Sequence, residues 1–93
     1  MNKRPVKRSK RVEMRQRRRD YFPHVFAWEG QEYRVEAVEQ CWTIPRHGRE
    51  NRVAGYCFRV RACPDSGEAD QEGVFDLFED AQTGDWRMRR QIQ

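Results

Sequence analysis

Residues 26–35, FAWEGQEYRV, constrain the fold more than any other stretch of this sequence. Apolar and polar side chains alternate on both sides of Glu29-Gly30-Gln31. A period of two is typical of a β-hairpin with one buried face, and glycine is a common turn residue. We therefore predict an antiparallel hairpin here, with the remaining sheet built onto it.

Similar alternation continues towards the C-terminus. In the strand after the hairpin turn, Val35 and Val38 have opposite parity, which predicts a bulge or bend near residues 37–40. Residues 82–85, QTGD, are typical of a turn between the last two strands. The expected strands cover residues 21–29, 31–44, 55–62, 74–80 and 86–92. These features predict a mainly β domain, a five-stranded antiparallel meander forming a strongly bent sheet or a small barrel.

The charge is divided unevenly along the chain. Residues 1–19 contain ten Lys and Arg against one Glu, a net charge of +9, whereas residues 20–93 carry −5. The first segment has too few apolar side chains to offset the entropy of ordering. We predict a disordered basic arm over residues 1–19, with a nascent helix over residues 10–19. A single small β-domain over residues 20–93 contains all eleven aromatic residues.

The arm carries the main functional prediction. Closely spaced Lys and Arg can replace the counterions condensed on a phosphate backbone, so we predict non-specific, electrostatic binding of DNA or RNA. A loop expected at residues 45–52 adds auxiliary arginines. The predicted contacts are Lys3, Arg4, Lys7, Arg8, Lys10, Arg11, Arg15, Arg17, Arg18, Arg19, Arg46, Arg49 and Arg52. The alternative interpretation of the arm is a solubilising end that has no dedicated ligand.

A second hypothesis assigns function to the β-domain. It is a protein–protein interaction module that docks a partner through a sheet edge or exposed aromatics, the arm being incidental. Arginines on the outer face around Asp76 allow two interpretations, a shallow anion-binding surface or ordinary cross-strand ion pairs, and we favour the pairs. These arginines are Arg34, Arg59, Arg61, Arg87 and Arg89.

No residue pattern indicates an enzyme, a metal site or a cofactor. Three cysteines, at positions 41, 57 and 63, and two histidines lack the usual zinc spacings, and buried reduced thiols are the simpler expectation. The acidic loop at residues 63–73 does not match the EF-hand order. No apolar run has the length of a membrane span. We therefore predict a cytoplasmic, monomeric protein without catalytic residues.

Several short motifs occur in a familiar order. They are Phe26-x-Trp28-x-Gly30-x-x-Tyr33-x-Val35-x-x-Val38, Trp42, Phe58-Arg59-Val60, Phe75-Asp76-Leu77 and Thr83-Gly84-x-Trp86. Over residues 24–92 the chain resembles an uncharacterised bacterial family of short β-rich domains, found alone and at the C-terminus of mutasome proteins related to Y-family DNA polymerases. The resemblance implies an accessory domain linked to DNA repair or damage tolerance, with nucleic acid or a DNA-repair protein as its partner. The ending Arg89-Arg90-Gln91 and the acidic loop after Cys63 depart from the family pattern.

Overall fold

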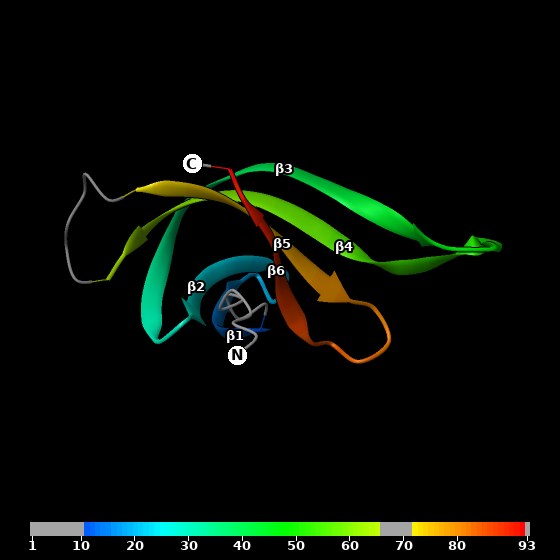
Figure 1. Cartoon of the computed structure of the whole chain (residues 1–93), viewed down its shortest axis with the longest axis horizontal. Helices are drawn as coiled ribbons and strands as arrows, with labels where there is room; N and C mark the ends of the chain where they lie inside the picture. Colours follow the sequence, from blue (N-terminus) through cyan, green and yellow to red (C-terminus); the bar gives the residue numbers. More distant parts are fainter. Residues whose placement is uncertain (1–10, 66–71, 93) are drawn as a thin grey trace, which may run out of the picture.

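The computed structural model is all-β, with six antiparallel strands that form a closed barrel (Figure 1). It describes residues 11–65 and 72–92, with the backbone alone at residues 49–51. The strands are β1 (Arg11–Arg18), β2 (Phe22–Trp28), β3 (Gln31–Arg46), β4 (Arg49–Pro64), β5 (Gly73–Asp80) and β6 (Trp86–Gln91). No helix long and apolar enough to cross a membrane occurs in these ranges.

Each strand pairs with the next along the chain, and β1 closes the barrel by pairing with β6. The predicted antiparallel meander and small barrel are therefore confirmed. The barrel has one strand more than expected, and that strand is β1.

β1 lies inside the segment that the sequence analysis placed in the arm. Val12 is only 4% exposed and belongs to the core, and Met14 packs against the core. Pairing with β2 satisfies the backbone groups along one edge of residues 12–18, while the arginines of β1 remain hydrated on its exposed positions. The start of the β-domain expected at residue 20 is therefore wrong, because β1 already belongs to the barrel. The nascent helix expected over residues 10–19 is also wrong, because strand pairing overrides the local helix propensity. Residues 1–10 of the predicted arm lie outside the described residues.

The β2–β3 hairpin has the predicted turn. Trp28 pairs with Gln31, and both central residues have positive φ, 50° at Glu29 and 77° at Gly30. This geometry is typical of a two-residue hairpin turn that matches the twist of its strands. The turn brings Phe26 and Tyr33 into a stacked pair with ring centroids 5.1 Å apart.

Gly30→Ala is expected to lower the free energy of unfolding by about 1 kcal/mol, because alanine is strained at positive φ. A Cβ at this position meets no heavy atom within 4 Å, so the cost comes from the backbone alone. Gly30→Asn is the matched control, since asparagine tolerates this conformation better. Urea unfolding monitored by tryptophan fluorescence measures both, and equal stability of the two variants would contradict the prediction.

The strands β3 and β4 form a hairpin that projects beyond the other strands (Figure 1). Register shifts between Val35 and Ala37 and between Val38 and Gln40 confirm the bulge predicted in this region. The loop expected at residues 45–52 is mostly wrong, because pairing continues to Arg46 and Arg49 and leaves a turn at residues 47–48. The proline at position 45 is accommodated at a further register shift.

The interior of the barrel is aromatic. The largest fully buried apolar side chains are Phe26, Phe58, Phe75, Leu77 and Val60. Cys57 is fully buried, as expected for the thiols, whereas Cys41 is exposed. Arg89 Nη1 donates a hydrogen bond to Cys57 Sγ at 3.7 Å. Burial raises the pKa of the Cys57 thiol, which favours its role as a small hydrophobe.

Candidate functional site at the β1–β6 seam

The barrel is closed by only a short contact between its first and last strands. β1 pairs with β6 at two positions, Arg11 with Arg87 and Val12 with Trp86. β6 begins at Trp86, directly after the β5–β6 turn, so no strand lies opposite the rest of β1. Within the described ranges, residues 13–18 therefore pair with β2 along one edge and with no strand along the other.

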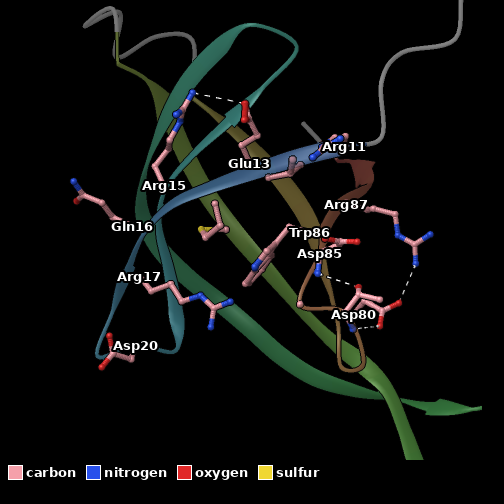
Figure 2. A pocket seen from close by; sticks show the side chains of 14 residues that line it. Arg11, Glu13, Arg15, Gln16, Arg17, Asp20, Asp80, Asp85, Trp86 and Arg87 are labelled. Atoms are coloured by element: carbon pink, nitrogen blue, oxygen red, sulfur yellow. Dashed lines mark hydrogen bonds and ion pairs between the residues drawn. The ribbon is translucent and has the colours of Figure 1, made fainter.

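A groove of about 920 Å³ lies along this open seam (Figure 2). One wall is β1, which contributes Arg11, Arg15 and Arg17. The β5–β6 turn forms the opposite wall, with Asp80 and Asp85. Figure 2 shows Trp86 between the two walls, where its indole forms part of the groove floor.

Trp86 is held from two sides. Its ring packs against Phe58 with centroids 5.4 Å apart, and the guanidinium of Arg17 lies 5.3 Å from the indole centroid. Arg17 is fixed in turn by Glu79, since Nη2 and Oε2 are 2.6 Å apart. Trp86 is buried, with only 4% of its surface exposed, yet its Nε1–H has no acceptor among the described residues. Such buried orphan donors are rare in native proteins.

The charged side chains at the rim differ in how firmly they are engaged. Arg15 makes only long contacts, 3.7 Å to Glu13 and 3.7 Å to Glu32, and is half exposed. Asp80 Oδ1 accepts hydrogen bonds from the backbone N–H groups of Gln82 and Thr83 at 2.8 and 3.1 Å. The bonds from Thr83 and Gln82 lower the pKa of Asp80 below its ordinary value.

Besides Arg11, Arg15 and Arg17 in the groove wall, the predicted nucleic-acid contacts that the structure describes fall into two groups. At the β1–β2 turn, Arg18 contacts His24 Nδ1 at 3.2 Å, and Arg19 is exposed. At the tip of the β3–β4 hairpin, Arg46 and Arg52 are exposed. None of these four arginines forms an ion pair with a described carboxylate. The side chain of Arg49 and the arm cations Lys3, Arg4, Lys7, Arg8 and Lys10 lie outside the described residues.

Four of the five arginines expected on this face form ion pairs, as favoured from the sequence, but only Arg59 pairs with Asp76 itself. Arg89 donates to Cys57 Sγ instead. Arg59 donates twice to Asp76, with Nε–Oδ1 at 2.8 Å and Nη2–Oδ2 at 3.0 Å. The third donor is Arg90, 3.2 Å from Oδ2, because a register shift next to Asp76 places Arg90 opposite it. Arg87 contacts Asp80 instead, at 4.0 Å.

The other two outer arginines also have acidic partners. Arg61 contacts Glu39 at 3.2 Å and Glu72 at 3.4 Å. Arg34 contacts Glu36 at 3.4 Å, and its other carboxylate partner is Asp65 at 3.6 Å. This face therefore has fewer free cations than a dedicated anion site would need.

Chemically, the seam is suited to binding. Its free strand edge, orphan indole N–H and arginines are donors for a ligand. Among the residues described, no three His, Cys, Asp or Glu side chains gather in a way that could hold a metal ion. Alternation of Val12 and Met14 was the one sequence signal for β1, whereas nothing local indicated the orphan donor of Trp86.

Function has to be inferred from the residues of this chain. A scan against protein-family models matched no family, and searches of curated proteins and of solved structures found no match. The resemblance to mutasome-associated domains therefore stays a prediction, as does the link with DNA repair.

Proposed function

We propose that the protein is a non-enzymatic barrel that binds DNA or RNA electrostatically through residues 1–10 and the β1–β2 turn. The supporting observation is the distribution of cations. Residues 1–10 contain five Lys and Arg and no acid, and they lead directly into β1. At the far end of β1, Arg18 and Arg19 have no carboxylate partner among the described residues. Closely spaced cations are what a phosphate backbone attracts.

The strand pairing of β1 refines which cations contribute. Arg17 is neutralised by Glu79 at 2.6 Å, so it has less charge to offer than Arg18 or Arg19. The five arm cations together with these two give about five to seven phosphate contacts, which corresponds to a salt slope of about −4.5 to −6. Arg46 and Arg52 at the hairpin tip are auxiliary contacts for a longer ligand.

The test is a salt titration of the full-length protein with a labelled duplex and a labelled single strand, over about 50 to 200 mM salt. Replacing the five arm cations with glutamine is expected to make the slope of log K against log salt shallower by about 4.5, at about 0.9 per contact. None of the five substituted residues belongs to a described strand, so loss of binding reports on charge.

Pairs of substitutions provide the matched control. Lys7→Gln with Arg8→Gln should make the slope shallower by about 1.8. Arg34→Gln with Arg61→Gln removes the same charge from side chains that already have acidic partners, so the slope should hardly change. Equal losses from both pairs, or no binding by the wild type at 50 mM salt, would refute arm-mediated binding.

A further inference from the structure

The outer face of strands β3 to β6 carries two aromatic rings that the core does not use. The register aligns one side chain from each strand in a row across this face, namely Trp42, Cys57, Phe78 and Arg87. Trp42 and Phe78 are half-buried, and neither is among the described side chains that form the core or pack against it. Part of each ring is therefore available to a ligand.

Both rings are stacked with arginine. The guanidinium carbon of Arg59 lies 5.6 Å from the centroid of Trp42, and that of Arg87 lies 5.2 Å from the centroid of Phe78. Gly55 leaves room for the second ring, because a Cβ at Gly55 would collide with ring atoms of Phe78. Aromatic rings and guanidinium planes are the two kinds of surface on which unpaired nucleobases stack.

A hollow of about 270 Å³ lies beside Phe78 and is large enough for one nucleobase. Its lining contains two arginines and no carboxylate, and consists of Ile44, Phe78, Arg87, Met88 and Arg89. Arg87 reaches Asp80 only at 4.0 Å, and 56% of its side chain is exposed. Arg89 is exposed and has no carboxylate partner among the described residues. Both arginines can therefore contact a phosphate next to a base in the hollow.

The charge around the two rings favours an anion. Four arginines stand against two aspartates, a net charge of +2, and they are Arg59, Arg87, Arg89 and Arg90 with Asp76 and Asp80. Beyond Ile44, the tip of the β3–β4 hairpin adds the exposed Arg46 and Arg52. Because ion pairs already engage part of this charge, the rings and not the arginines would provide most of the affinity.

We propose that this outer face binds the unpaired bases of a nucleic-acid single strand, which stack on Trp42 and Phe78, while Arg87 and Arg89 contact the adjacent phosphates. This inference rests on the proposed binding of nucleic acid and specifies its ligand. Bases inside a duplex are stacked on one another and cannot lie on a protein ring. The arm attracts any phosphate backbone, and the outer face selects single strands.

The probe is a fluorescently labelled twelve-nucleotide oligothymidine, compared with a twelve-base-pair duplex at about 200 mM salt, where the contribution of the arm is reduced. Full-length protein should bind the single strand at least about fivefold more tightly than the duplex, the effect of one stacked base. The unlabelled strand should also quench tryptophan fluorescence. The quenched residue is Trp42, because Trp28 and Trp86 are each only 4% exposed.

Two substitutions of Trp42 separate stacking from structure. Trp42→Leu removes the ring and should weaken binding of the single strand at least about fivefold. Trp42→Phe keeps a ring and should retain most of the affinity, but it should abolish most of the quenching. A purely structural role of Trp42 would not produce this combination.

A matched pair of arginine variants tests the phosphate contacts. Arg89→Gln should make the slope of log K against log salt for the single strand shallower by about 0.7. Arg61→Gln is the control and should leave the slope unchanged, because Arg61 is already paired with Glu39 and Glu72. If Trp42→Leu disturbs folding, this pair and Trp42→Phe still decide.

The outcomes separate this inference from the proposed function. If Trp42→Leu binds the strand like wild type, while binding still depends on the arm cations, only the outer-face site is refuted. Equal quenching by the duplex would also refute it, and quenching by thymidine monophosphate at the same nucleotide concentration would assign the rings to free nucleotides. A strand that binds without quenching Trp42 would leave the rings to a protein partner. No binding of any nucleic acid at about 50 mM salt would refute the proposed function, and this inference with it.

Discussion

A chain that starts at residue 20 is expected to lose cooperative unfolding, whereas a chain that starts at Arg11 should retain it. The first truncation removes β1, which buries Val12 and packs Met14 against the core. A buried valine contributes about 1.5–3 kcal/mol, and each backbone hydrogen bond to β2 adds about 1 kcal/mol net. The combined loss of about 5 kcal/mol or more is comparable to the whole stability of a small domain.

Urea unfolding followed by tryptophan fluorescence and circular dichroism distinguishes the two truncations. The chain starting at Arg11 is the control, because it loses none of the described residues. If the chain starting at residue 20 unfolds cooperatively at the wild-type midpoint, β1 is dispensable and the barrel does not depend on its closure. The unfolding experiment also determines how nucleic-acid binding should be tested. A truncation that unfolds the barrel cannot show what the arm alone contributes to binding.

The predictable parts of the fold are those in which apolar and polar residues alternate along a short segment. Residues 26–35 signal their hairpin because apolar side chains occur at every second position around a glycine turn. The bulge in β3 was predictable for the same reason, since Val35 lies in the core and Val38 packs against it although their parity differs. β1 was missed because Val12 and Met14 are its only apolar side chains, and its pairing with β6 joins residues far apart in the sequence.

The candidate site was predictable in its charges but not in its geometry. The sequence supplies the arginines of β1, yet the open seam depends on where β6 begins relative to β1. Likewise, alternation alone could not show that Arg90, and not Arg87 or Arg89, lies opposite Asp76. That pairing depends on a register shift between β5 and β6. Register between strands is set by tertiary packing and bulges, which no short window of sequence contains.

Asp76→Ala is expected to lower the free energy of unfolding at pH 7 by about 2–3 kcal/mol. The carboxylate is 2% exposed and accepts hydrogen bonds from Arg59 and Arg90. Removing one member of a fully buried ion pair costs about 3–5 kcal/mol. The loss expected for Asp76→Ala is smaller, because the guanidinium groups of Arg59 and Arg90 both reach solvent. Asp85→Ala, at an exposed carboxylate, is the control and should change the stability by no more than about 0.5 kcal/mol.

The pH dependence of this difference identifies its cause. Burial alone would raise the pKa of Asp76, but hydrogen bonds from Arg59 and Arg90 outweigh it and hold the pKa below its ordinary value of 3.8. A carboxylate whose pKa is lower in the folded state stabilises the protein above the unfolded-state pKa, and this stabilisation is lost as the pH falls through the folded-state pKa. The gap in stability between wild type and Asp76→Ala should therefore be constant from pH 7 to about pH 5 and should narrow below about pH 4. A gap of unchanged size at pH 3 would mean that Asp76 acts through packing and not through its charge.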